Sequence, residues 1–358
     1  MPRLVKRLAI SLTVFAALTI GGELYLRSQN YGAIPSVWFD PEIGTRFHPS
    51  QTREIYGPKM TYLSKARINA EGFRGADFDA PGVKRAQRIA CLGDSFTFGW
   101  GVEDDETFPV RLAAALESGA TAGQWQVLNC GMPGYNTWQE LRLYEKAVRP
   151  AQPKVVVIGW YANDLDPYSI GATGTLAPTD HPLAGTAILD WYVRKFRPTK
   201  PNFQFSGLDV DAAKSLKPFY DTNRDLVEHN AGDPRARPYV ERNLEHLGLL
   251  FDAIQQDGAQ PVLLVFPTVG QMDALKAKRA SSPEPEYLAD RAIVARIQAD
   301  LAAFAASRGV LSVDLLDAYM ASEVRPFGSV DLSHPSVRGQ QLAADALAAA
   351  LEAAGLLK

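Results

Sequence analysis

One serine stands where it could act as a nucleophile. Residues 88–92 (RIACL) form a short apolar run that reads as a buried strand, and Gly93, Asp94 and Ser95 follow at once. Small, turn-forming residues let the chain bend sharply there. Open α/β sheets place their ligands at the carboxyl ends of strands, so we expect the Ser95 hydroxyl and N–H to lie exposed at such an end. Gly-Asp-Ser alone is weak evidence, because common residues often meet by chance.

A nucleophilic serine needs a base, a group that orients the base, and donors for the developing oxyanion. His334 stands in a predicted turn just before a helix, with Asp331 three residues earlier. One turn can hold both, so that the carboxylate binds Nδ1 while Nε2 faces Ser95. Taken alone, Asp-x-x-His is more often a helix-capping turn. The other histidines fall in a linker, an insertion or on a helix surface: His48, His181, His229 and His246.

Alternating strands and helices must position these side chains. Apolar runs predict strands at residues 88–92, 126–129, 154–159, 261–266 and 310–314, and helices at 107–116, 137–148, 239–257, 286–307 and 336–354. Thr107 is expected to cap the first of these helices, with Pro109 in its first turn. The uninterrupted apolar run at 155–158 is typical of a strand covered on both faces. The alternation favours a parallel sheet with helices on both sides.

Two stretches interrupt this alternation. Residues 28–87 are predicted to be a linker with short accessory strands, in which residues 69–75 (NAEGFRG) fit a simple turn as well as a role near the site. Residues 165–238 leave the carboxyl end of the third strand and are rich in aromatic residues, which predicts an insertion capping the site. Residues 187–197 have the pattern of a short amphipathic helix. The aromatic rings read as a cap core, with sugar or acyl recognition and membrane contact as alternatives.

Residues 1–27 are predicted to be a signal anchor or signal peptide. Basic residues precede an uncharged apolar stretch, residues 8–22, and no clear small-x-small cleavage site follows. An uncleaved anchor is favoured, with a secreted protein and a buried core helix as alternatives. The positive-inside rule then places the rest of the chain on the outer side of the membrane, periplasmic or extracellular.

Composition narrows the class of protein. The 358 residues carry a net charge of −3 with the basic residues interspersed, which argues against a nucleic-acid binder. The length suits one large domain with additions, or two small domains. Cys91 and Cys130 end apolar runs and are expected to be buried thiols. No His/Cys cluster has zinc spacing, so we predict no metal site.

Four segments in this order resemble the SGNH (GDSL-type) hydrolase family. They are GDSF at 93–96, NCGMPG at 129–134, AND at 162–164 and DLSHP at 331–335. The resemblance covers about residues 85–355. It implies a flavodoxin-like three-layer α/β/α sandwich with a parallel sheet, in a domain spanning residues 88–358 that carries the insertion. Tyr161 stands where the third block usually has glycine, which leaves the shape of that loop open.

The resemblance also implies roles for these residues. Ser95 would be the nucleophile, His334 the general base and then acid, and Asp331 its orienting group. The Ser95 N–H, the Gly134 N–H and the Asn163 side-chain amide would form the oxyanion hole, without metal or cofactor. We therefore expect an esterase that forms an acyl-enzyme and hydrolyses carboxylic esters, with acetyl esters of saccharides preferred. The alternatives are a saccharide O-acetyltransferase with the same triad, an inactive saccharide-binding module, and a flavin-binding protein.

Overall fold

A five-stranded parallel sheet carries the Ser95 turn at the end of its second strand. The computed structural model describes residues 2–28, 37–40, 42–56, 61–79, 87–119, 121–167, 188, 192, 210–229 and 233–358. Its strands are β5 (Gln87–Gly93), β6 (Trp125–Gly131), β7 (Val155–Trp160), β8 (Gln260–Val265) and β9 (Leu311–Asp314), in the order β6-β5-β7-β8-β9. Each neighbouring pair is parallel, which confirms the predicted sheet.

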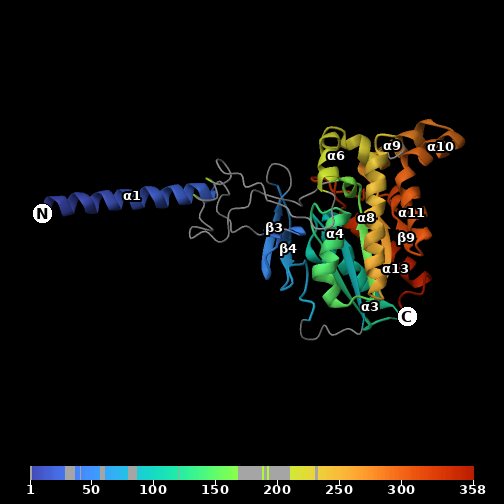
Figure 1. Ribbon diagram of the computed structural model, residues 1–358, viewed down its shortest axis with the longest axis horizontal. Coiled ribbons are helices and arrows are strands. Elements are labelled where there is room, and N and C mark those ends of the chain that lie inside the picture. Colours follow the sequence, from blue (N-terminus) through green and yellow to red (C-terminus); the bar gives the residue numbers. More distant parts are fainter. Residues whose placement is uncertain are drawn as a thin grey trace. The chain divides into compact units, whose positions relative to one another are not determined.

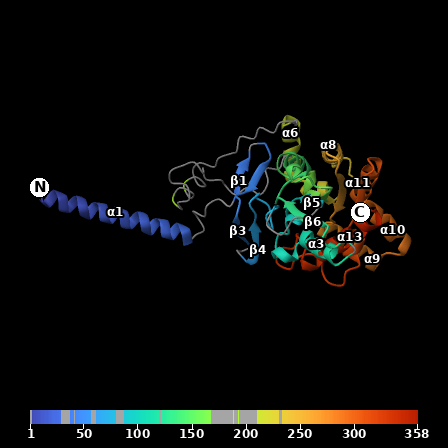
Figure 2. The ribbon, with the colours of Figure 1, turned by 90° about the horizontal axis from the view of Figure 1, so that it is seen from below.

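Helices cover both faces of this sheet (Figure 1 and Figure 2). On one face, Ile89 and Cys91 of β5 share a core with Leu112 of α3 (Phe108–Ser118) and Leu347 of α13 (Val337–Ala353). The other face holds α4 (Thr137–Leu143) and α8 (Arg237–Gln256). Helix α12 (Leu316–Met320) contributes to the first core, and α6 (Val210–Thr222) and α7 (Arg224–His229) precede α8 in the chain. The predicted three-layer sandwich is confirmed.

A buried polar network joins the layers on the second face. Asn243 of α8 donates to the Thr137 hydroxyl of α4 at 2.8 Å and accepts from the Trp160 indole of β7 at 2.9 Å. All six residues of β7 are buried, as the uninterrupted apolar run predicted. Cys91 and Cys130 are buried free thiols, also as predicted.

The prediction of one helix over residues 286–307 is wrong. Two helices, α10 (Glu284–Val294) and α11 (Arg296–Ser307), meet at Ala295, whose φ of −94° and ψ of 21° lie outside the helical range. The Val294 carbonyl accepts from the Gln271 side chain at 3.0 Å instead of continuing the helical ladder. Gln271 belongs to α9 (Val269–Ser281), a helix that the sequence pattern did not indicate.

Two further helix boundaries differ from expectation. Helix α4 ends at Leu143, and residues 144–148 of the predicted helix form a π-helical turn (Tyr144–Val148) followed by a 3₁₀ turn (Arg149–Ala151). Thr107 precedes α3 with Pro109 in the first turn, but its side chain does not cap the helix. The Thr107 hydroxyl instead donates at 3.3 Å to the carbonyl of Asp104, which begins the 3₁₀ turn η2 (Asp104–Glu106).

Short strands occupy part of residues 28–87. These are β1 (Val37–Asp40), β2 (Gly44–Phe47), β3 (Gln51–Tyr56) and β4 (Tyr62–Ile68). Strands β3 and β4 form an antiparallel hairpin, and Arg74 after it makes an isolated antiparallel bridge with Asn129 of β6. The hairpin segment is thereby tied to the edge of the main sheet.

The N-terminal helix α1 (Pro2–Ser28) belongs to a separate compact unit of the chain. Its stretch Val5–Leu26, 22 residues with a mean hydropathy of 1.6, is long and apolar enough to cross a membrane. The predicted helix at residues 187–197 lies outside the described residues except for positions 188 and 192, and so does most of the predicted cap at 165–238.

Candidate functional site

The Ser95 turn follows strand β5 directly. Helix α2 (Ser95–Phe98) starts two residues after β5, and the Asp94 carboxylate caps it by accepting from the Phe96 N–H at 2.8 Å. Gly131 ends the neighbouring strand β6, where an added Cβ would lie 2.2 Å from the Phe98 nitrogen. Only glycine lets α2 pack this closely on β6. Ser95 therefore lies at the carboxyl end of the sheet, as predicted.

Ser95, His334 and Asp331 form one hydrogen-bonded chain. His334 Nε2 lies 2.8 Å from Ser95 Oγ, although 239 residues separate them in sequence. His334 Nδ1 lies 2.6 Å from Asp331 Oδ2. The Ser333 N–H and hydroxyl donate to Asp331 Oδ1 at 3.2 Å and 2.7 Å. Such a chain can supply a nucleophile, a base and an orienting carboxylate in the order that acyl transfer requires.

The loop that carries His334 is closed by its own main chain. The Gly328 N–H donates to the His334 carbonyl at 2.9 Å, and the Ser336 N–H donates to the Pro326 carbonyl at 2.8 Å. Ser336 then caps α13 by accepting from the Gly339 N–H at 3.3 Å. The predicted turn followed by a helix is confirmed. These hydrogen bonds fix the loop that carries the His334 imidazole at the start of α13.

The Asp331 carboxyl is held in its ionised form. Burial acts to raise its pKa, but the hydrogen bond and charge of His334, with the bonds from Ser333, outweigh burial and place the pKa of Asp331 well below its usual value. An ionised carboxylate is what an imidazolium forming at His334 needs as its partner.

Gly134 occupies a tight turn next to the carboxyl end of β5. The Tyr135 N–H donates to the Met132 carbonyl at 3.2 Å, and Gly134 has a φ of +78°. Pro133 followed by a glycine with positive φ is the signature of a type II turn. The Met132 N–H donates to the Gly93 carbonyl at 2.8 Å, which ties this turn to the end of β5.

Asn163 belongs to a 3₁₀ turn, η5 (Ala162–Leu165), after β7. Its side-chain amide donates to the Tyr135 carbonyl at 3.3 Å and acts to lower the pKa of Asp94. The structure therefore brings the loops after β5, β6 and β7 together, with Ser95, Gly134 and Asn163 each on one of them. The shared oxyanion hole stays a prediction.

Tyr161 fits the position where the family usually has glycine. Its φ of −134° is extended backbone open to any residue, so no glycine is needed. Its ring stacks on Phe96 with centroids 3.8 Å apart, and Phe96 lies 5.4 Å from the His334 ring. Tyr161, in place of glycine, therefore packs an aromatic ring against Phe96 close to His334.

Arg74 braces the site, and sequence reasoning left its role open. It is 2% exposed, and all five of its N–H groups are used. They donate to the carbonyls of Lys65, Phe98, Gly99 and Val102 and to the Asp104 carboxylate, at 2.6–3.0 Å. Arg74 therefore joins hairpin strand β4 to the loop after α2. The only signal for it was the NAEGFRG segment.

Replacing Arg74 with lysine is expected to destabilise the fold. Lysine lacks the planar fork and leaves several buried carbonyls unpaired, at about 1–3 kcal/mol for each group. We expect the free energy of unfolding of the full chain in detergent micelles, measured in urea, to fall by about 3 kcal/mol. Arg67→Lys, at an exposed position on the same hairpin, is the control. A loss no larger than that of the control would contradict the bracing role.

Gln340 is a second support that the sequence did not reveal. It is fully buried in α13, where its Nε2 donates to the Phe96 carbonyl at 3.1 Å and its Oε1 accepts from the Phe108 N–H at 2.7 Å. One side chain thus links the helix after His334 to the helix that begins with Ser95. A polar residue on the core face of the predicted closing helix was the only available signal.

Three acidic side chains are buried beneath the site: Asp94, Glu140 and Asp164. Burial raises the pKa of Asp94 to about 6, against the lowering effects of the Phe96 N–H and of His334. Burial also raises the pKa of Asp164, with a further contribution from the charge of Asp94. Within the described residues, no group of three or more His, Cys, Asp or Glu is arranged to hold a metal ion.

The raised pKa of Asp94 predicts a pH-dependent stability. Because its folded pKa exceeds the unfolded value, the folded chain binds more protons, and the free energy of unfolding falls as pH rises from about 4 through 6. We expect Asp94→Asn to reduce this fall by about 2 kcal/mol between roughly pH 4.5 and 7.5, measured by urea unfolding. Exposed Asp105→Asn is the control. An unchanged pH slope in Asp94→Asn would refute the shift.

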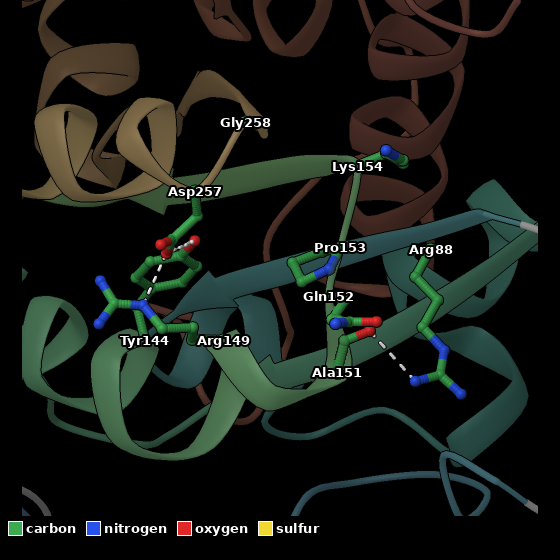
Figure 3. Close-up of a pocket in the computed structure, with 9 residues that line it drawn as sticks. All are labelled: Arg88, Tyr144, Arg149, Ala151, Gln152, Pro153, Lys154, Asp257 and Gly258. Atoms are coloured by element: carbon green, nitrogen blue, oxygen red, sulfur yellow. Dashed lines mark hydrogen bonds and ion pairs between the residues drawn. The ribbon is translucent and has the colours of Figure 1, made fainter.

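A cavity of about 680 Å³ is lined by residues at the amino ends of the strands, opposite the end of the sheet that carries Ser95 (Figure 3). Several of its polar groups bond to one another: Tyr144 and Arg149 both donate to Asp257, at 2.7 Å and 2.6 Å, and Arg88 donates to the Ala151 carbonyl at 3.1 Å. No serine, cysteine or histidine is among the lining residues that the structure describes. We therefore take the Ser95 site as the candidate active site because of the side chains that it contains, and not because of its volume.

Most of the chain is similar to proteins of one known family. Residues 91–342 match the model of the GDSL-like lipase/acylhydrolase family. Similar solved structures include a protein described as lipolytic and of the G-D-S-L family from Desulfitobacterium hafniense (13% identity, 74% of this chain and 99% of that chain, TM-score 0.42). Others are a catalytic mutant of an acetylxylan esterase from Geobacillus stearothermophilus (14%, 75% and 94%, 0.43) and a protein described as a GDSL-like lipase from Parabacteroides merdae (18%, 77% and 98%, 0.42). No curated protein matches the chain.

Proposed function

The chain belongs to the GDSL-like lipase/acylhydrolase family and is an ester-hydrolysing enzyme, and on that premise we propose that Ser95, His334 and Asp331 are its catalytic triad. One observation supports this most strongly. A single imidazole lies 2.8 Å from the serine oxygen and 2.6 Å from a carboxylate that is held ionised.

Acylation follows from these contacts. Ser95 Oγ attacks the ester carbonyl carbon while His334 Nε2 takes the hydroxyl proton. The tetrahedral intermediate collapses, the bond from carbon to the alcohol oxygen breaks, and the imidazolium gives its proton to that oxygen. Alcohol leaves, and the acyl group stays on Ser95. Asp331 fixes the imidazole and stabilises its positive charge throughout.

Deacylation repeats the sequence with water. His334 takes a proton from water as the water oxygen bonds to the acyl carbon. The bond to Ser95 Oγ then breaks, the imidazolium returns its proton to that oxygen, and the carboxylic acid departs. Each half-reaction begins and ends with neutral His334, so no external acid or base is consumed.

The oxyanion hole is assigned to the N–H groups of Ser95 and Gly134 and the Asn163 amide. Removing one such donor costs about 10²–10³ in kcat. We expect Asn163→Ala to lower kcat by about that factor with little change in KM. Asn163→Asp, which keeps the shape but adds a charge, should be at least as slow. An Asn163→Ala enzyme with wild-type kcat would remove Asn163 from the oxyanion hole.

We propose acetyl esters of saccharides as the substrate class. The test supplies an acetylated xylo-oligosaccharide to the full chain in detergent micelles and follows free acetate beside acetyl transfer to an added unacetylated oligosaccharide. Equal release of acetate and deacetylated sugar is expected. Transfer in place of acetate release would make the enzyme an O-acetyltransferase with the same triad.

We propose that α1 anchors the protein and that the catalytic domain lies on the outer side of the membrane. The apolar stretch Val5–Leu26 follows Arg3, and positive charge before a span favours the inner side for that end. Alkaline carbonate extraction should leave the full chain in the membrane fraction, and protease added to intact spheroplasts should digest the domain. Release by carbonate would indicate a cleaved signal peptide, and protection from protease the opposite orientation.

A further inference from the structure

A small apolar pocket adjoins His334. It has a volume of about 190 Å³, and three segments line it. Its apolar lining residues are Leu63 of β4, Trp100 and Val102 after α2, and Val330, Pro335 and Val337 around His334. None of its lining residues belongs to the turns that hold Gly134 and Asn163. The pocket therefore lies on the imidazole side of Ser95.

The proposed reaction decides which part of an ester enters this pocket. His334 Nε2 must reach the alcohol oxygen to give it a proton, since that transfer releases the alcohol. The group attached to the alcohol oxygen must then lie beside His334. The carbonyl oxygen, by contrast, faces the donors assigned to the oxyanion hole, which line no part of the pocket.

The size and chemistry of the pocket indicate what alcohol fits. About 190 Å³ is below the range of roughly 300–1,000 Å³ for drug-sized ligands, so one ring fits and a long chain does not. The Trp100 ring lies 6.1 Å from the His334 ring. Trp100, with its indole N–H, and Ser329, with its hydroxyl, are both among the lining residues. An apolar lining that also offers polar groups suits a sugar ring, which has an apolar face and hydroxyl groups around it.

Leu63 closes the pocket from outside the family region. It precedes residues 91–342, and its Cδ1 lies 3.7 Å from where a Cβ on Gly101 would be. Arg74 fixes the position of Leu63 in the pocket, because its Nη2 donates to the carbonyl of Lys65 in β4 and to the carbonyl of Val102, which lines the pocket. The N-terminal hairpin thus contributes a lining residue from outside the residues that match the family.

We propose that this pocket is the alcohol subsite, that it takes a single pyranose ring stacked on Trp100, and that Leu63 limits its size. The inference rests on the proposed function, because it uses His334 as the acid that protonates the leaving group.

Two ester series test the assignment in the full chain. One keeps acetate and changes the alcohol from ethanol to methyl xylopyranoside. The other keeps p-nitrophenol and lengthens the acyl chain from acetyl to hexanoyl. We expect Trp100→Ala to lower kcat/KM for the acetylated xyloside by about tenfold and for ethyl acetate by less than twofold. It should change all acyl lengths by one common factor. A factor that depends on acyl length would make the pocket an acyl site and overturn the proposal.

Binding gives a readout that needs no turnover. We expect methyl xylopyranoside to bind the Ser95→Ala protein, measured by calorimetry. Adding Trp100→Ala should weaken binding about tenfold, whereas Val324→Ala, outside the pocket lining, should leave it unchanged. No binding, or equal binding in all three proteins, would refute a sugar subsite. Failure of the proposed function would show separately, as ester hydrolysis that survives Ser95→Ala.

Discussion

Replacing Ser95 with alanine is expected to lower kcat/KM for p-nitrophenyl acetate by about 10⁴–10⁶, and His334→Ala by a similar factor. Without Oγ no acyl-enzyme can form, and without the imidazole the serine keeps its proton. The effects should not add in the double variant, because the two groups act as one unit. KM should change little, since neither change removes the oxyanion donors.

The matched control is Ser118→Ala, an exposed serine whose hydroxyl donates to the Ala115 carbonyl within α3. It should retain activity within about twofold of wild type, as exposed changes away from the site normally do. Activity unchanged in Ser95→Ala would refute the triad. A wild-type protein that binds saccharide but hydrolyses no ester would point to a binding module.

Replacing Asp331 with asparagine is expected to lower kcat/KM by about 10³–10⁴. The carboxylate accepts from Nδ1 at 2.6 Å, which leaves Nε2 free to take the Ser95 proton. An asparagine amide can donate to Nδ1 instead, and this favours the tautomer with a proton on Nε2. The base is then in the wrong form at every pH at which the imidazole is neutral.

The pH profile distinguishes this role from a structural one. The pKa of Asp331 lies well below its usual value, so the wild-type carboxylate stays ionised through mildly acidic pH. Asp331→Asn should therefore be slow from about pH 5 to 9 while the protein remains folded. Ser333→Ala, which removes one of two bonds to Asp331 Oδ1, should cost less than about tenfold. An Asp331→Asn enzyme that regains full rate at high pH would contradict the tautomer account.

The central sheet could be predicted because its signals are local. Val155 to Ile158 are consecutive, apolar and buried, and burial on both faces needs no information from elsewhere in the chain. Helix α9 escaped prediction because few of its residues, among them Met272 and Leu275, reach the core. The break at Ala295 escaped because the Gln271 side chain, which bonds the Val294 carbonyl at this point, lies 23 residues away in the sequence.

The residues of the site fall into the same two groups: those that the local sequence indicates and those that depend on distant parts of the chain. Ser95, His334 and Asp331 lie in motifs whose residue types indicate the chemistry, and the structure places the three side chains in contact. Arg74 and Gln340 act through main-chain carbonyls and N–H groups of distant segments, and any residue type can offer those. Such supports become visible only when the fold brings the partners together.

The most direct test of the account is to look for the acyl-enzyme itself. Full-length protein is mixed with p-nitrophenyl acetate, quenched in acid within the first turnovers, digested, and examined by mass spectrometry, beside Ser95→Ala treated identically. The account predicts one added acetyl group on the peptide that contains Ser95, and none on that peptide in the variant. An enzyme that hydrolyses the ester with the acetyl group on another residue, or with Ser95→Ala fully active, would contradict it.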